Sequence, residues 1–527
     1  MAKFVNSSNS IPSSLLLWDD IPTQTSIEDT YDLKVWPVTS ILSGGPLHFN
    51  IPPQPKGLLS DIQIVTKLKV QQNGQDITTP KRDVSIINNL ANCLWGEVSV
   101  LCAERTELCQ SMKNAYAYQT FFNHALNSDS NREDYLFYNE AFLMDSGKSK
   151  KSEEDLRIFW KWDKTKDYLT KVDGGDVPEG STEEAERDKI KEGLWRCKCS
   201  EGYNYLYASA VEGETASDEY KIEVDNFMSH ANAWIPTSFN VAASKRSMLI
   251  NGGQSLILNS KFQSPLFNTS KCLPTNMKIR ISLTKNRDEL LLLCKDDAGY
   301  SIVLEDCYLN VTYYRVRDEI LDLMEERLAK DAATYFVSKP QIIIRPIAKS
   351  SRFIRMTDIF ADKIPPYAFF ALQRSTDFEG KFSSNCFSFV PFKTFQFYLN
   401  GTPYFTDPLE VRTITKFINR TGHADDYIYE DFGEYMRQLY RTAGKDSKGN
   451  CLIDSTNFNL NFMVGMSFGA DRSSLSDGHL NLQENASTYL EIDMGIDEVY
   501  NDLILIVYAP FDRQIQIDAN RMVRIVE

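Results

Sequence analysis

Apolar and polar residues alternate with a period of two along many stretches of this chain. The clearest alternating stretches are 62–70, 277–283, 395–399, 490–494 and 515–517. Asn73 and Gly74 follow the first stretch, and Asn400 and Gly401 follow the third, which is the strongest short signal of a hairpin turn. Because successive side chains of a strand point to opposite faces, each stretch predicts a half-buried β-strand. Such strands are predicted in both halves of the chain.

One segment past the middle has the period of a helix instead. Ile320, Met324, Leu328 and Ala332 fall four residues apart and are separated by mostly charged residues. This spacing predicts an amphipathic helix over 317–334, with Pro340 closing the stretch after it. We interpret the helix as the connection between two β domains.

The pattern predicts an all-β chain with four parts. They are a flexible N-terminal arm (1–16), a first β-sandwich (17–316), a linking helix (317–338) and a second β-sandwich (339–527). No short repeat is visible, and the two β segments do not align by eye. The similarity of the two sandwiches is therefore inferred from architecture alone.

A charged insertion at about 148–200 interrupts the first half. Seven of the ten residues in 148–157 are charged, and so are eight of the eleven in 182–192. The simplest interpretation is a solvated insertion with short helices. A surface projection that meets a partner has the same composition, and the sequence does not separate the two.

Composition and charge narrow the function. The 527 residues are 42% hydrophobic and 24% charged, which is an ordinary globular balance. The formal charge of −15 argues against a chain whose main task is to coat nucleic acid, so no sequence-specific nucleic-acid binding is predicted. No apolar run approaches the roughly 18 residues of a membrane span. The first ten residues are polar and predict no secretory signal, so the ten cysteines are interpreted as reduced thiols.

The sequence motifs of common enzymes are absent. No glycine-rich phosphate loop, dinucleotide fingerprint, nucleophile elbow or zinc-protease motif occurs. The five histidines, which are far apart in sequence, are His48, His124, His230, His423 and His479. A catalytic triad assembled in space remains the less favoured alternative to ordinary hydrogen-bonding histidines.

Two further groups of residues are weaker candidates for chemistry. Cys197 and Cys199 are spaced one residue more tightly than a zinc knuckle and have no second pair nearby. Asp493, Asp497 and Glu498 could serve glycoside chemistry, but a polar loop before the final strands is the favoured interpretation. The phenylalanines at strand spacing between 387 and 397 are interpreted as core rather than as a base-stacking platform. We therefore predict no enzyme, no catalytic residue, no cofactor site and no metal site.

The segment 17–28, Leu-Trp-Asp-Asp-Ile-Pro-Thr-Gln-Thr-Ser-Ile-Glu, resembles the N-terminal signature of the major capsid proteins of Polinton (Maverick) elements and adintovirus-like viruses. Trp18 and Ile21 replace the Phe and the first Pro of that signature. Further matches follow in order at 44–49, 62–74, 94–100, 116–118, 264–268, 277–290, 328–335, 385–389, 507–512 and 515–518. The charged insertion has no matching segment.

The resemblance implies a double jelly roll, with two eight-stranded sandwiches side by side in one chain. It implies a structural capsid protein of the virion whose homotrimers form pseudo-hexameric capsomers of an icosahedral shell around double-stranded DNA. The implied partners are neighbouring capsomers and a minor (penton) capsid protein. The protein would be made in the host cytoplasm and assembled there or in the nucleus.

Alternatives stay open at this point. A host-resident, domesticated copy kept as a scaffold would have the same sequence features, and only genomic neighbours would separate it from a virus. A sandwich-fold lectin or carbohydrate-active enzyme is a third candidate. Related viruses encode a protease that cuts after Gly-Gly, and Gly252-Gly253 fits that loose pattern, although a β-turn is the favoured interpretation.

Overall fold

The computed structural model describes most of the chain from residue 24 onward. The described ranges are 24–41, 44–77, 84–103, 106–107, 113–145, 241–269, 271–294, 299–348, 352–360, 363–375, 378, 387, 389–418, 424–443, 451–455, 457–458, 461–469, 485–495 and 503–526, together with the backbone of 160–163, 168–171, 197–199 and 202–204. The predicted arm, 1–16, and most of the predicted charged insertion lie outside these ranges.

Antiparallel sheets make up the first half. One sheet has the order β1 (Ile27–Val35), β15 (Tyr300–Val316), β3 (Gly57–Gln72) and β12 (Leu256–Lys261), with β4 (Gln75–Asp76) paired to β3. A second sheet has the order β2 (Leu47–Ile51), β13 (Ile279–Lys285), β6 (Trp95–Cys102) and β7 (Thr106–Glu107). The short strands β5 (Val84–Ile86) and β14 (Leu292–Cys294) pair separately.

The second half repeats this arrangement. Its first sheet has the order β16 (Ala333–Ile347), β26 (Leu503–Ile517), β18 (Tyr367–Arg374) and β24 (Val464–Ser467), with β27 (Val523–Val526) paired to β26. Its second sheet has the order β17 (Phe353–Thr357), β25 (Thr488–Asp493), β19 (Thr394–Leu399) and β20 (Thr402–Pro403), with β21 (Leu409–Glu410) also paired to β19.

The two halves have one topology. The strands of the two main sheets in each half can be numbered 1 to 8 along the chain. This numbering leaves out β4 and β27 and counts β20 and β21 together as the fifth strand of the second half. Both halves then have the sheet orders 1-8-3-6 and 2-7-4-5. This is an eight-stranded antiparallel sandwich of the jelly-roll type. The predicted fold class, two jelly-roll sandwiches joined by a helix, is confirmed.

Both predicted hairpin turns are present. Asn73 and Gly74 have φ values of 51° and 76° between β3 and β4, and Asn400 and Gly401 have φ values of 50° and 78° between β19 and β20. Two consecutive positive φ angles favour the type I′ turn, which Asn-Gly tolerates best.

The linking helix is shorter than predicted. Helix α8 spans Asp318–Lys330, and β16 begins at Ala333, inside the range 317–338 assigned to the linker. The reason is a change of period after Ala332, because Tyr335 and Val337 are buried while Phe336 and Ser338 are exposed. Pro340 lies within β16 rather than closing the helix, opposite Pro510 of β26.

Helices fill the connection between the fifth and sixth strands of each half. In the first half these are α2 (Ala115–Asn127), α3 (Ser130–Glu140) and α6 (Val241–Leu249), followed by the turn η4 (Asn251–Gly253); in the second half it is α10 (Gly433–Thr442). Two single-turn helices, α1 (Leu90–Cys93) and α7 (Asp288–Leu291), complete the first half. The alternating pattern that predicted the strands did not reveal these helices.

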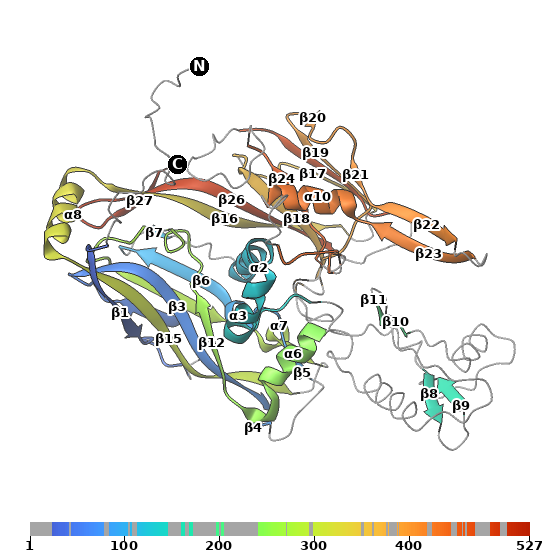
Figure 1. Ribbon diagram of the computed structural model, residues 1–527, viewed down its shortest axis with the longest axis horizontal. Coiled ribbons are helices and arrows are strands. Elements are labelled where there is room, and N and C mark those ends of the chain that lie inside the picture. Colours follow the sequence, from blue (N-terminus) through green and yellow to red (C-terminus); the bar gives the residue numbers. More distant parts are fainter. Residues whose placement is uncertain are drawn as a thin grey trace, which may run out of the picture.

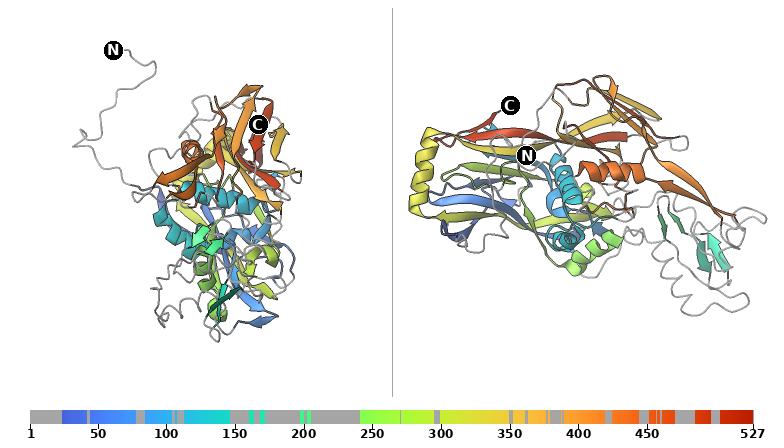
Figure 2. Two further views of the ribbon diagram at one scale, coloured as in Figure 1. Left: turned by 90° about the vertical axis from the view of Figure 1, so that its right-hand side faces the viewer. Right: turned by 45° about the horizontal axis from the view of Figure 1, so that its top comes forward.

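The four main sheets are stacked. From top to bottom in Figure 1, the sheet containing β19 is followed by those containing β26, β6 and β3, with α2 between the halves. Helix α8 crosses one end of both sandwiches, as Figure 2 also shows. At the opposite end lie the hairpin of β22 (Arg412–Ile418) and β23 (Ala424–Asp431) and the short pairs β8 (Trp160–Asp163)–β9 (Tyr168–Lys171) and β10 (Cys197–Cys199)–β11 (Gly202–Asn204).

Candidate interaction surfaces

The chemical candidates that the structure describes, His48 on β2, His124 on α2 and Asp493 on β25, lie on different elements. The imidazole Nδ1 of His48 lies 2.8 Å from the Ser282 hydroxyl on the surface of the β2–β13 pair. The imidazole Nε2 of His124 lies 2.8 Å from the carboxylate of Glu140, buried between α2 and α3. The other three histidines lie outside the described residues. Among the described residues, no group of three His, Cys, Asp or Glu side chains is placed to hold a metal ion.

Of the carboxylate and cysteine candidates, the structure describes the side chain of Asp493 alone. The Asp493 carboxylate accepts hydrogen bonds from the Gly495 amide (2.9 Å) and from Arg352 Nε (3.3 Å) at the end of β25. Asp497 and Glu498 lie outside the described residues. Cys197 and Cys199 lie on β10, of which only the backbone is described. Gly252 and Gly253 form the η4 turn.

The phenylalanine cluster is core, as predicted. All five of its members are buried: Phe387, Phe389, Phe392, Phe395 and Phe397. Phe395 and Phe397 lie on β19 and pack against Phe370 of β18 inside the second sandwich. Phe387 has a different role, because it contacts the first half of the chain.

Helix α2 joins the two sandwiches through aromatic side chains. The Phe121 ring stacks on Phe387, with ring centroids 4.1 Å apart and planes 3° from parallel. The Phe122 ring lies 5.2 Å from that of Tyr508 on β26. Aromatic pairs of this kind add about 0.5–1.5 kcal/mol each to the burial of their area. The two sandwiches therefore form one block with a continuous apolar core.

Two strands of the second half, β18 and the first part of β26, are buried on both faces where α2 packs on their sheet. The nine residues of β26 from Leu503 to Phe511 are all buried, and so is β18 from Ala368 to Gln373. A strand buried on both faces loses the alternation of a half-buried one. The equivalent strand of the first half, β15, keeps that alternation from Cys307 to Tyr313. The corresponding sheet of the first sandwich thus leaves its outer face uncovered by the rest of the described chain.

We name this surface the first open face and define it by the outward side chains of β1, β15 and β3 together with Trp36, which directly follows β1. It combines aromatic rings with charged side chains. The Trp36 ring, 53% exposed, lies 5.0 Å from that of Tyr308, and the Lys34 ammonium lies 4.8 Å from the Tyr308 ring centroid. Lys67 of β3 pairs with Glu305 at 3.0 Å.

The opposite side of the stack has a second open face, made by the outward side chains of β17, β25 and β19. The Glu491 carboxylate accepts hydrogen bonds from the hydroxyls of Tyr489 (2.9 Å) and Tyr398 (3.1 Å). Arg355 lies 3.3 Å from the same carboxylate. Phe353 is 59% exposed at its edge. Both open faces thus expose aromatic rings, a residue class that is enriched at protein interfaces.

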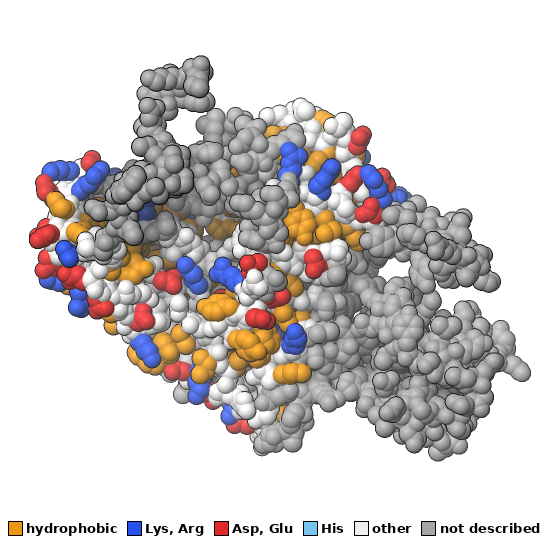
Figure 3. Space-filling model, in the orientation of Figure 1, with side chains coloured by type: hydrophobic (Ala, Val, Ile, Leu, Met, Phe, Trp, Pro, Cys, Tyr) orange, Lys and Arg blue, Asp and Glu red, His pale blue; other side chains and the backbone are white. Residues whose placement is uncertain are grey.

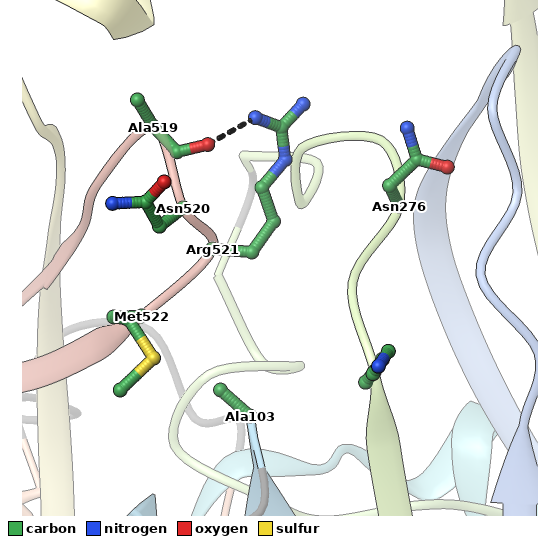
Figure 4. Close-up of a pocket in the computed structure, with 7 residues that line it drawn as sticks. Ala103, Asn276, Ala519, Asn520, Arg521 and Met522 are labelled. Carbon is green, nitrogen blue, oxygen red and sulfur yellow. Dashed lines mark hydrogen bonds between the residues drawn. The ribbon is translucent and has the colours of Figure 1, made fainter.

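A polar network closes the α8 end of the stack. Arg521, in the β26–β27 turn, donates to the Thr275 carbonyl (3.0 Å) and to the Glu325 carboxylate (2.5 Å), and Thr275 also donates to Glu325 (2.7 Å). Burial raises the pKa of the Glu325 carboxyl, but the hydrogen bonds from Thr275 and Arg521 outweigh it and hold the pKa below its ordinary value. Arg521 also lines a pocket of about 440 Å³ with Asn276 and Met522 (Figure 4).

Hydrophobic side chains also gather over β12, α3 and α6 (Figure 3). The exposed members are Tyr135 and Tyr138 of α3, Met248 of α6 and Ile257 of β12. We name these four residues the α3 patch. In the described part of the chain, no helix is long and apolar enough to cross a membrane.

Comparison with known proteins identifies the fold. No family model matches the sequence, and no curated protein does. Among solved structures, a chain of the Sputnik virophage particle aligns with a TM-score of 0.53 at 10% identity, covering 100% of this chain and 94% of that one. The Faustovirus major capsid protein aligns with a TM-score of 0.50 at 9% identity, covering 95% and 92%. The Faustovirus protein is, by its name, a structural protein rather than an enzyme. At this level of identity the similarity concerns the fold, and the chain has the double jelly-roll fold of viral major capsid proteins.

Proposed function

We propose that this chain is the major capsid protein of a double-stranded DNA virus or virus-like element, of the lineage that includes Polinton (Maverick) elements and adintovirus-like viruses. The observation that carries the proposal is the repetition of one jelly-roll topology in both halves, together with the two open faces. A chain with two similar lobes can occupy a six-fold position in a shell as a trimer.

The internal interface suggests how three copies assemble. Within one chain, the outer side of the β6 sheet and α2 face the β26 sheet of the second half. The equivalent pairing between copies brings the second open face of one chain, beside α10, against the first open face of the next. Such head-to-tail contacts close into a ring when the rotation fits, and six similar lobes require about 60° between neighbours.

The remaining parts of the chain follow from this arrangement. We propose the division into an arm (1–16), a first jelly roll (17–316), a linker that contains the helix Asp318–Lys330 and ends before β16 rather than at 338, and a second jelly roll from β16 onward. The charged insertion and the β22–β23 hairpin then point outward, at the end away from α8, because a solvated charge run is costly to bury. The α3 patch is the proposed contact with neighbouring capsomers or with a penton protein.

The seam is tested by the mass of the protein in solution. Wild type is expected at 3 × 60.3 = 180.9 kDa. Trp36→Glu and Phe353→Glu each place a carboxylate on one open face and are expected to give monomers. A mixture of the two variants retains one intact pair of faces and is expected to form a dimer of 2 × 60.3 = 120.6 kDa.

Tyr138→Glu, in the α3 patch, is the matched control and keeps the trimer while weakening shell assembly. Trimers that persist in both open-face variants would exclude this seam. We propose that the arm lies on the inner face of the shell or connects capsomers. Deletion of residues 1–12 is therefore expected to spare the trimer and to weaken the shell, as seen by negative-stain imaging; unchanged shell assembly would contradict this role.

A further inference from the structure

A groove of about 670 Å³ lies between α8 and the loop around Cys272, beside the start of β16. Its apolar lining includes Leu58, Leu321 and Leu328. Met324 of α8 also lines it and is 47% exposed. An apolar groove with an exposed methionine at its side is a binding surface for apolar side chains.

The N-terminal segment enters the described structure next to this helix. The backbone amide of Arg317, which immediately precedes α8, donates to the carbonyl of Ser26 at 3.2 Å. Ile27 of β1 is paired with Val316, the last residue of β15. Residues 1–23, which lie outside the described ranges, therefore join the chain at the N-terminal end of α8.

The segment 17–23 has the composition and the reach to fill the groove. It reads Leu-Trp-Asp-Asp-Ile-Pro-Thr, with three apolar residues around two acids. Trp18 precedes Gln24 by six residues, which span about 20 Å when extended. The 13 residues of α8 are also about 20 Å long at 1.5 Å per residue. Trp18 can thus reach any part of the groove.

The charges at the groove suit this segment. Two basic side chains, Lys271 and Arg327, line the groove. Its two acidic side chains are Glu325 and Asp331, and Glu325 already accepts a hydrogen bond from Arg521. Asp19 and Asp20 would meet these basic side chains. We propose that residues 17–23 occupy the groove of their own chain, with the Trp18 indole against Leu321 and Leu328. This docking concerns a single chain and does not depend on capsomer formation.

The Cys272 thiol lines the groove and provides the first readout. In the full chain, Trp18→Asp is expected to raise the rate of N-ethylmaleimide labelling at Cys272 at least fivefold, measured by peptide mass spectrometry. Val5→Asp, outside the segment, is the matched control and leaves the rate unchanged. Cys294, which is half-buried in the same sandwich, reports general unfolding and keeps its rate in both variants. Equal Cys272 rates in wild type and Trp18→Asp would overturn the proposal.

A cross-link distinguishes the source of the segment. Trp18→Cys under mild oxidation is expected to form a disulfide with Cys272 inside one 60.3 kDa chain. A cross-linked dimer would show that the segment of a second copy fills the groove. The absence of any cross-link would show that the segment of neither copy fills it. Either result overturns the proposal. The mass of the uncross-linked protein tests the trimer separately, so the two proposals can fail independently.

Discussion

The phenol oxygen of Tyr118 in α2 lies 2.5 Å from Oε1 of Gln373 in β18, so a buried hydrogen bond connects the two halves of the chain. The Tyr118 ring also meets Phe387 edge-on, at a centroid distance of 5.4 Å. Since α2 belongs to the first sandwich and β18 to the second, these contacts set the angle between the sandwiches within one chain. The relative orientation of the two jelly rolls is thus built into the single chain.

The hydrogen bond itself can be removed with little change in shape. Tyr118→Phe is expected to lower the free energy of unfolding by about 1–3 kcal/mol, because a buried amide oxygen loses a donor. Urea denaturation followed by tryptophan fluorescence measures the change. Tyr138→Phe on exposed α3 is the control, with an expected change within about 0.5 kcal/mol. A change no larger than this control would show that the bond contributes nothing to joining the halves.

The Arg521–Glu325 pair predicts a pH-dependent contribution to stability. The pKa of Glu325 in the folded chain lies below its ordinary value of 4.5, so its contribution is fully present above pH 4.5 and is lost as the pH falls through the folded-state pKa. Glu325→Gln is expected to lower the free energy of unfolding by about 1 kcal/mol or less at pH 7, because the side chain is partly exposed.

The difference between wild type and Glu325→Gln should shrink as the pH is lowered below 4.5, in urea titrations at a series of pH values. Glu326→Gln is the matched control, since Glu326 pairs with Lys330 on the exposed side of α8. Its expected effect is about 0.3–0.5 kcal/mol. A Glu325→Gln effect that is independent of pH would contradict the ionic origin.

The two ends of the long segment between the fifth and sixth strands of the first half are held together by a buried ion pair. Asp145 precedes residues 146–240, and Arg246 of α6 follows them; their side chains meet at 2.6 Å. Arg246 also donates to the carbonyls of Ile86 and Leu143, both at 3.0 Å. The described residues on either side of the segment thus hold the two ends of this connection together.

Removing the partner of a buried cation should therefore be costly. Asp145→Asn is expected to lower the free energy of unfolding by about 3–5 kcal/mol, because the Arg246 guanidinium stays buried without its carboxylate. Asp318→Asn breaks the exposed pair with Lys56 and serves as the control, at about 0–1 kcal/mol. Thermal denaturation compares the two variants. Equal losses of stability would show that the buried pair contributes no more than the exposed pair.

The Asp145–Arg246 ion pair also predicts that the segment between these two residues is dispensable for folding. Replacement of residues 149–238 by a glycine-serine linker of about ten residues is expected to preserve the folded core, because loop-closure entropy changes only slowly with length. Circular dichroism and the unfolding transition check the result. Loss of the cooperative transition would show that the segment is part of the sandwich core.

Gly465 of β24 is packed too closely for a side chain. A Cβ there would lie 2.7 Å from Cβ of Thr442 in α10 and 3.0 Å from Cε1 of Phe369. Gly465→Ala is expected to lower the free energy of unfolding by about 1–3 kcal/mol through overpacking. Gly433→Ala, at the exposed start of α10, is the control; its Cβ would lie 3.0 Å from the flexible Asp431 carboxylate, which can move aside, so a smaller loss is expected than for Gly465→Ala. Equal melting temperatures would show that α10 can move away from β24.

The alternating stretches predicted strands correctly because each lies on a sheet with one buried face. Ile62 and Ile64 on β3, and Leu490 and Ile492 on β25, are buried at every second position, as the period of two requires. The Asn-Gly turns were equally predictable, since their positive φ angles are a local property. Helix α8 was also predictable, because the spacing of its apolar residues is a local property. Its end was placed too late in the chain, because only two residues separate Lys330 from the start of β16.

The sequence by itself determined the strands, the turns and the division of the chain by a helix, because these depend on neighbours within a few residues. The tertiary structure alone decided which surfaces are covered. The run from Leu503 to Phe511 is buried on both faces only because α2, nearly 400 residues earlier, packs on it. Nothing local marks Trp36 and Phe353 as lying on the two open faces, since their exposure depends on the stacking of four sheets.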